Sequence, residues 1–236
     1  MIDESAAATG LPEQTELPPR PPFFGRLWRV FVQPGALFSE LARNPAWFPI
    51  TLLVAAITAA VMWFTPVELF LQAAISGAPA EQAAEIAEGM AQVPPILIKG
   101  GAVGAAFLMT LLFPIVLGAI TYVIFVFIRG DEATYKQHLG VVAHAGVISA
   151  LGAILNGFVN NRGGTLEQTL SIGTFLPFLS DGYFTELLLA LDLFQLWGAV
   201  VAGIGLAAID PRRSAGSTAA ILIALVVVIG LIRAAF

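Results

Sequence analysis

The chain of 236 residues contains no cysteine, and only 11% of its residues are charged. The lack of cysteine excludes disulfides, thiolate catalysis and thiolate metal sites. A soluble domain carries about 25% charged residues, so this chain has less than half of the charge that a water-facing surface needs. Its net charge is −5 and its sequence shows no basic stripe, which argues against nucleic acid as a partner.

The sequence also lacks the short motifs that carry common catalytic chemistry. It has no glycine-rich phosphate loop, no G-x-S-x-G elbow and no H-E-x-x-H pair. Its two histidines, His138 and His144, are six residues apart and so fall on different helix faces, unlike the i, i+4 pair that a metal prefers. We therefore predict no enzyme, no cofactor and no metal site.

Apolar residues are abundant instead, at 58% of the chain. Ala46 to Phe64 is free of charge, and roughly 17–25 apolar residues span a bilayer as a helix. Further apolar runs predict an all-α fold, a polytopic membrane helical bundle of about five transmembrane helices. The predicted spans are 46–64, 101–128, 139–158, 183–209 and 217–235.

A basic amphipathic stretch, 23–44, precedes the first span. Phe23, Leu27 and Val30 fall at helical spacing on one face, with Arg26 placed to reach away from it. Pro34 suits the first position of a second helix. We predict a pair of interfacial helices that lie on the membrane surface. The predicted membrane-interface residues are Arg26, Trp28, Arg29, Pro34, Phe38, Arg43, Pro45 and Trp47.

Three connecting segments complete the predicted organisation. Residues 1–22 are acidic and proline-rich and are predicted to form a disordered cytoplasmic tail. Glu81, Glu85 and Glu88 recur at helical spacing, which predicts a short acidic helix. Leu166–Leu179 is apolar but interrupted by glycine and proline, and we interpret it as interfacial or partly re-entrant.

Lysine and arginine are distributed unevenly between the two sides of the predicted bundle. With about five spans, one side holds most of them and the other holds only Lys99, Arg162 and Arg233. Cytoplasmic loops carry the excess of basic residues. We therefore predict a multi-pass protein of the cell (inner) membrane with its N-terminus in the cytoplasm and its C-terminus outside.

Asp192 lies inside the predicted fourth span. A carboxylate at mid-bilayer costs on the order of 2.5–3.5 kcal/mol, so an intramembrane acid suggests a function. The candidate ligand or transport residues are Asp192, Gln195, Asn156, Thr110 and Lys99. Gln195 shares a helix face with Asp192, and the other three match its depth in the membrane. The alternative is a structural Asp192 that is held by hydrogen bonds, and the sequence leaves both open.

Small residues four apart occur on two predicted spans. The pairs are Gly100 with Gly104, and Gly198 with Ala202. Such pairs allow helix backbones to approach closely. We predict that they pack helices within the bundle, and homodimerisation is the alternative.

Three motifs follow one another along the chain. The leading segment reads Phe31-x-x-Pro34-x-x-x-Phe38-x-x-Leu41-x-x-x-Pro45-x-Trp47-x-Pro49; the third span opens with Lys136-Gln137-His138-Leu139; and the fourth contains Leu191-Asp192-Leu193-Phe194-Gln195-Leu196-Trp197. Their order resembles the Yip1 family of multi-pass membrane proteins, and the resemblance covers about Phe23 to the C-terminus. Because the N-terminal region is short, the chain is more similar to a prokaryotic member than to the eukaryotic ones associated with vesicle traffic and Rab-type GTPases.

The resemblance implies five spans, a cytoplasmic N-terminus and a scaffold role for Asp192, Trp197 and the leading motif. We predict a non-enzymatic membrane-organising or partner-binding protein. Its predicted partners are membrane lipid and either other proteins or a second copy of itself. The alternative function is a small transporter or channel that uses Asp192.

Overall fold

The computed structural model of the chain describes residues 19–166 and 169–235. All regular structure in these ranges is helical, apart from one isolated bridge between Ser171 and Asp192. The elements are α1 (Phe23–Val32), α2 (Pro34–Leu41), α3 (Phe48–Phe64), α4 (Val67–Ser76), α5 (Ala80–Ala91), α6 (Pro95–Tyr122), the π-helix η1 (Val123–Ile128), α7 (Tyr135–Gly163), the 3-10 turn η2 (Gly173–Phe175), α8 (Tyr183–Ala190), α9 (Leu193–Ile209) and α10 (Ala215–Arg233).

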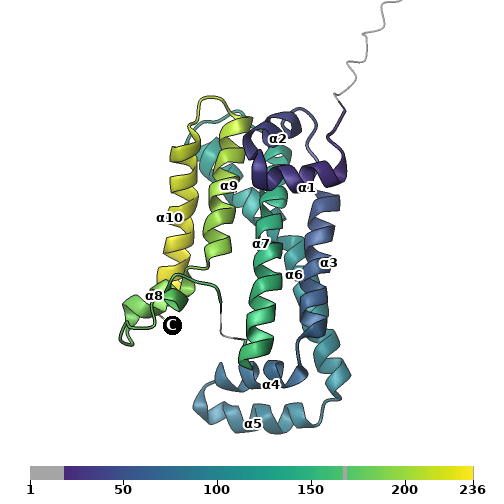
Figure 1. Ribbon diagram of the computed structural model, residues 1–236, viewed down its shortest axis with the longest axis vertical. Helices are drawn as coiled ribbons and strands as arrows, with labels where there is room; N and C mark the ends of the chain where they lie inside the picture. Colours follow the sequence, from purple (N-terminus) through teal and green to yellow (C-terminus); the bar gives the residue numbers. More distant parts are fainter. Residues whose placement is uncertain (1–18, 167–168, 236) are drawn as a thin grey trace, which may run out of the picture.

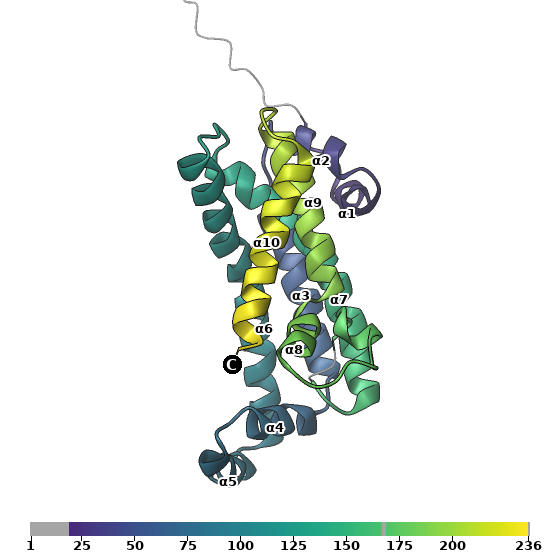
Figure 2. The same cartoon turned by 90° about the vertical axis from the view of Figure 1, so that its left-hand side faces the viewer.

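The bundle consists of α3, α6, α7, α9 and α10, which run along the long axis of the molecule (Figures 1 and 2). Helix α7 is central, because it packs against α3, α6 and α9, and α9 in turn packs against α10. Helices α1 and α2 lie across one end of the bundle, whereas α4 and α5 lie at the other (Figure 1). This arrangement confirms the predicted all-α helical membrane bundle.

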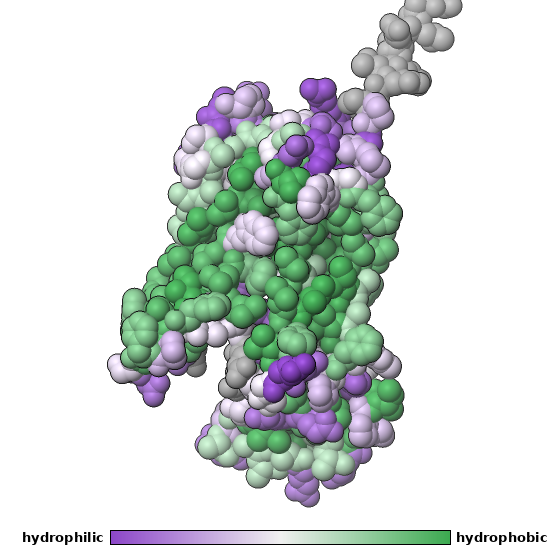
Figure 3. Space-filling model, viewed as in Figure 1, coloured by the Kyte–Doolittle hydropathy of each residue, from purple (hydrophilic) through white to green (hydrophobic). Residues whose placement is uncertain are grey.

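The surface of the bundle exposes many large apolar side chains. Figure 3 shows a broad hydrophobic belt across the middle of the molecule, bordered by hydrophilic residues at the α1–α2 end and at the α4–α5 end. Within the described residues, α6 with η1, α7 and α10 are each long and apolar enough to cross a membrane. The pair α3 and α4 qualifies together but bends by 93°, and α9 is shorter at 17 residues. The chain is therefore a multi-pass membrane protein.

Local sequence explains where most helices begin. Prolines precede or open α2, α4, α5 and α6, where their fixed φ suits the first turn. Thr134 and Gln137 form a reciprocal capping box at the start of α7. Gly164 ends α7 with φ +70, in the left-handed region that favours glycine.

The helices differ from the predicted segments at several places. The prediction of one continuous helix over 183–209 is wrong, since α8 ends at Ala190 and α9 begins at Leu193. Helix α4 was not predicted. The span predicted over 101–128 corresponds to α6, which begins earlier, at Pro95, and changes to the π-helix η1 after Tyr122. Most of the predicted tail, residues 1–18, lies outside the described residues.

Candidate functional site

Asp192 begins α9 rather than lying within a helix. Its Oδ1 accepts hydrogen bonds from the backbone N–H groups of Phe194, at 2.7 Å, and Gln195, at 2.9 Å. This is the geometry of an N-cap, in which a carboxylate satisfies the free donors of the first helical turn. The negative charge also lies at the positive end of the helix dipole. Asp192 is thus placed where a helix itself stabilises a carboxylate.

The other carboxylate oxygen of Asp192 connects α9 to α7. Asn156 of α7 donates from Nδ2 to Asp192 Oδ2 over 2.9 Å, while its own Oδ1 accepts from the backbone N–H of Leu170 at 2.8 Å. Asp192 is 7% exposed. The Asn156 amide therefore joins three segments that are distant in sequence.

The segment after α7 returns to the bundle and pairs with the break between α8 and α9. The N–H of Ile172 donates to the carbonyl of Leu191 at 3.1 Å, and the N–H of Leu193 donates to the carbonyl of Leu170 at 3.0 Å. In an apolar environment every backbone polar group needs a partner within the protein. We call Asn156, Leu170–Ile172 and Leu191–Leu193 the helix-break site, since together they replace the hydrogen bonds that the break removes.

Only some of the candidate ligand residues meet at the helix-break site. Asp192 and Asn156 are in direct contact, and Gln195 contributes its backbone N–H. A cavity of about 210 Å³ beside them is lined by Ser149, Gly152, Ala153, Asn156, Asp192, Phe194 and Gln195. Thr110 lies elsewhere, in a larger groove, and the Lys99 ammonium lies 5.6 Å from the centre of the Trp63 ring. Thr110 and Lys99 are therefore not brought to the helix-break site, and their ligand role remains a prediction.

At the other end of α9, helices α1 and α2 are built into the bundle. Phe38 is fully buried and fits against Gly205 of α9, where an added Cβ would lie 2.8 Å from its ring. The same ring meets His144 of α7 edge-on, at 6.4 Å between centroids, and Phe31 meets Trp197 of α9 at 5.7 Å. We call α1 and α2 the platform, because these contacts fix them to α7 and α9.

Arg26 is a buried part of the platform, which corrects the prediction that it reaches away from the apolar face. Residues 23, 26 and 30 share a helix face, and that face turns toward α7. The guanidinium lies 3.5 Å from His144 Nε2 and 5.5 Å from the Phe23 ring centre, and its Nε has no hydrogen-bond partner among the described residues. Burial lowers the pKa of Arg26 from its ordinary value, with the charge of Arg20 acting in the same direction.

The rest of the predicted membrane-interface set also lies at this end. Arg29 makes a bidentate ion pair with Glu40, at 2.6 and 2.8 Å, and its hydrogen bond holds the pKa of Glu40 below the usual range. Pro34 opens α2, and Trp47 packs against the core. Pro45 accepts a hydrogen bond from Arg20 at 3.3 Å. Arg43 is exposed.

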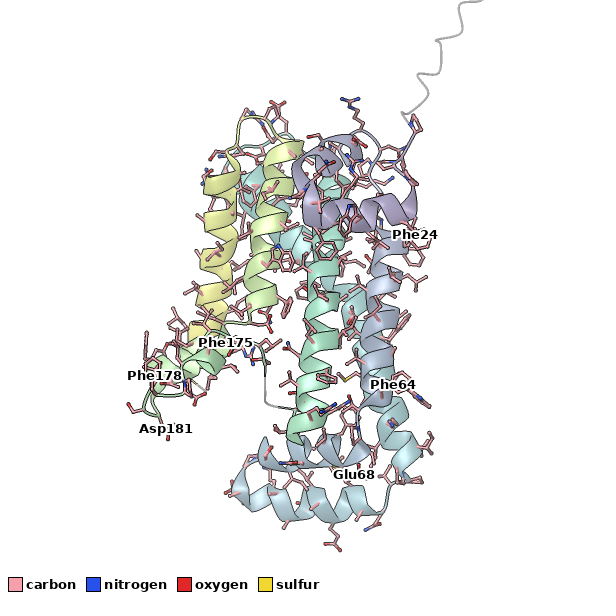
Figure 4. The ribbon with its side chains drawn as sticks, in the orientation of Figure 1. Phe24, Phe64, Glu68, Phe175, Phe178 and Asp181 are labelled. Carbon is pink, nitrogen blue, oxygen red and sulfur yellow. The ribbon has the colours of Figure 1, made fainter. Side chains whose placement is uncertain are left out.

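The outer face of α1 is apolar and open. Phe24, Trp28 and Val32 recur every four residues and are 81%, 66% and 48% exposed. Figure 4 shows Phe24 at the outer edge of the platform, beside the start of α3. We call these side chains the α1 stripe. An amphipathic helix that lies across the end of a membrane bundle presents such a stripe to the headgroup region.

Comparison with known families decides what kind of bundle this is. The Yip1 domain matches residues 28–235, from within α1 to the end of α10. The chain belongs to the Yip1 family. It is also similar to the membrane protein YknW of Bacillus subtilis (strain 168), with 28% identity over 194 residues, which cover 79% of this chain and 78% of that protein. A comparison with solved structures finds no match.

Two loops at the platform end of this Yip1 domain are joined by ion pairs that the sequence analysis did not predict. Arg213 pairs with the buried Asp131 and donates to the carbonyl of Arg129 at 2.7 Å. Arg212 pairs with Asp210 at 2.8 Å and with Glu132 at 3.3 Å. The hydrogen bond from Arg212 holds the pKa of Asp210 well below its usual range. In sequence these residues show only as charged loops, because their pairing depends on the loop after η1 meeting the loop after α9.

The glycines of the Yip1 domain pack differently from the prediction. An added Cβ at Gly100 or Gly104 would meet no atom within 4 Å, so their predicted packing within the bundle is wrong. At Gly198 it would lie 3.9 Å from the carbonyl of Ala145 on α7, and Ala202 is buried. The closest approaches involve glycines outside the predicted pairs, such as Gly203, whose added Cβ would lie 2.4 Å from Ala219 Cα.

No cluster in the described ranges suits a metal. A search of those residues finds no group of three or more His, Cys, Asp or Glu side chains that could hold an ion. His138 instead faces Thr121, at 3.2 Å between Nδ1 and Oγ1, and His144 Nδ1 lies 2.8 Å from the carbonyl of Gly140.

Proposed function

We propose that this Yip1 protein is a non-enzymatic membrane-organising protein that holds a partner protein at the cytoplasmic face of the cell membrane through its platform. The observation that carries the proposal is the combination of a rigidly attached platform with an open α1 stripe. A helix pair that only anchored the chain would not need Phe38 of α2 fully buried, or Arg26 of α1 buried against α7.

The distribution of charge supports a cytoplasmic position for the platform. Most basic residues lie in the platform and in the loops near it, whereas Lys99, Arg162 and Arg233 belong to the opposite end of the bundle. We infer that the N-terminus is cytoplasmic and that α10 ends outside. The α1 stripe then lies at the inner headgroup boundary, where it contacts both lipid and a membrane-bound partner.

The bonding of Asp192 favours a structural role over the alternative of a transporter. Both of its carboxylate oxygens are occupied by protein donors, two from the α9 backbone and one from Asn156. An ion or substrate would have to compete with these bonds for the carboxylate. We therefore place the function at the platform rather than at the helix-break site.

Photocrosslinking in native membranes tests the proposal. A photoreactive amino acid in place of Trp28 should give one dominant protein adduct, which a Phe24→Glu change in the same chain should abolish. The matched control replaces Phe113, which is 60% exposed on α6, and should give lipid adducts alone. Lipid adducts alone from both positions would contradict the partner-holding role.

A further inference from the structure

A groove of about 540 Å³ runs along one side of the bundle between α6 and α10. Helix α6 packs on α3 and α7, whereas α10 packs on α9 and α8, and α10 stands beside α6 in Figure 2. The floor of the groove is formed by small side chains of α7 and α9, including Gly146, Gly198 and Ala202. We call this space the lateral groove.

The lateral groove is open toward the membrane rather than toward water. Met109 and Phe113 of α6 and Ile229 of α10 line it and are 68%, 60% and 50% exposed. These residues belong to α6 and α10, which are each long and apolar enough to cross a membrane. A molecule that enters from this side must therefore come from the bilayer.

The walls of the groove are more apolar than their residue types suggest. The hydroxyls of Thr51, Thr58 and Thr121 donate back to carbonyls of their own helices, each at 3.0 Å. A threonine bonded in this way satisfies its hydroxyl and presents its methyl group. The volume lies within the range of about 300–1,000 Å³ that is usual for ligand sites with mostly apolar walls.

One charged residue lies at one end of this apolar space. Among the described residues, Arg233, the last residue of α10, is the only charged one that lines the groove. Its guanidinium has no hydrogen bond or ion pair within the described residues, and it is exposed. A groove with an unpaired cation at its end fits a molecule with an anionic head and an apolar tail.

The length of the groove matches one leaflet. Along α10 it extends from Leu222 to Arg233, which at about 1.5 Å per residue is about 16 Å. Half of a hydrocarbon core of about 30 Å is about 15 Å. We propose that the lateral groove binds one acyl chain of an anionic phospholipid, with the phosphate at Arg233 and the chain end near Thr121 and Leu222.

Gly146 provides a direct test, because an added Cβ there would meet no atom within 4 Å while the residue lines the groove. Gly146→Leu should fill the groove without disturbing the bundle. The matched control is Gly100→Leu, which adds the same side chain to a helical glycine with open space and lies outside the groove.

The assay reconstitutes the full chain in vesicles of equal parts phosphatidylglycerol and phosphatidylcholine, extracts it in mild detergent and counts retained lipid by native mass spectrometry. The wild-type chain should retain one phospholipid, with about a fivefold preference for phosphatidylglycerol. Gly146→Leu should lower lipid retention roughly tenfold, because the new side chain and an acyl chain would overfill the groove. Gly100→Leu should leave lipid retention unchanged. Arg233→Gln should remove the preference for phosphatidylglycerol but keep the bound lipid.

Equal retention by Gly146→Leu and Gly100→Leu, or no retained lipid in the wild-type chain, would overturn the proposal. A second measurement needs no variant: a phosphatidylglycerol with a photoreactive group at the end of one acyl chain should label α6 and α10 peptides that contain Thr121 and Leu222. Labelling spread evenly over the lipid-exposed surface would also overturn it. Neither result bears on the platform, whose test depends on Trp28 and Phe24.

Discussion

Removing the Asp192 carboxylate should destabilise the bundle by an amount that the helix-break site allows us to work out. Asp192→Ala removes the N-cap of α9, which contributes about 1 kcal/mol and at most about 2 kcal/mol. It also removes the bond from Asn156, and hydrogen bonds between membrane helices average about 0.6 kcal/mol with a maximum near 1.7 kcal/mol. The expected loss of unfolding free energy is therefore about 1.5–3.5 kcal/mol.

The more conservative Asp192→Asn change tests the hydrogen-bond directions. The cap needs an acceptor toward α9, which leaves the new amide group facing Asn156. The Asn156 amide cannot turn to accept from it, because its Oδ1 already accepts from the N–H of Leu170. Two donors would then face each other. We expect a loss of about 1 kcal/mol, because a hydrogen bond is replaced by an unsatisfied donor.

The double variant Asp192→Asn/Asn156→Asp should recover most of that loss. The carboxylate at position 156 would accept from both Leu170 and the new amide, so each polar group would have a partner again. Equilibrium unfolding in mixed micelles with increasing dodecyl sulfate measures all of these variants. If the double variant loses less unfolding free energy than the two single variants lose in sum, the two residues act as a pair.

The matched control is Glu186→Ala, since Glu186 is an exposed carboxylate on α8 whose side chain makes no bond within the described part of the chain. It should change the unfolding free energy by less than about 0.5 kcal/mol. If Asp192→Ala were no more harmful than this control, the structural role of Asp192 would be refuted. Flux through reconstituted vesicles that Asp192→Asn abolished without loss of stability would instead favour the transporter alternative.

Three other predictions concern the packing and the charges. Gly203→Leu should lower the unfolding free energy by about 3 kcal/mol or more, because the new Cβ would overlap the backbone of Ala219, whereas Gly104→Leu should be nearly neutral in the same micelle assay. Arg26→Met should leave stability unchanged or raise it by up to about 1 kcal/mol, since a buried and poorly paired cation is replaced by an apolar chain of similar length; a clear loss would contradict this. The lowered pKa of Asp210 means that its pairing stabilises the fold fully above about pH 4, the value for an unfolded aspartate, and less as the pH falls below it. Asp210→Asn should therefore flatten the fall in stability between about pH 4 and pH 2, and an unchanged acid profile would show that the pair contributes nothing.

Membership of the Yip1 family assigns the chain to a membrane architecture but not to an activity. The platform, the helix-break site and the lateral groove divide the bundle into parts with different physical roles. The platform joins α1 and α2 to the bundle, the helix-break site stabilises an interrupted helix, and the groove faces lipid. The proposed experiments address these parts through separate residues, so the result for one does not depend on another.

Several helices could be predicted because their signals are local. The periodic apolar face of 23–31 and the position of Pro34 predicted α1 and α2, and the uncharged run before Phe64 predicted α3 to within two residues at its start. The acidic spacing around Glu85 likewise predicted α5. Such features depend on a few neighbouring residues, and so the sequence by itself determined these helices. The apolar composition likewise determined that the solvent is a membrane.

The break at Asp192 and the roles of the glycines were decided by the tertiary structure. An apolar run with one aspartate has the same composition whether it is one helix or two, and only the partners at Asn156 and Leu170 make the interrupted form stable. Gly100 and Gly203 look alike in sequence, but one faces open space and the other a helix backbone. The physical reason is that hydrogen-bond satisfaction and close packing depend on which distant segment lies opposite, and composition and periodicity carry no record of that.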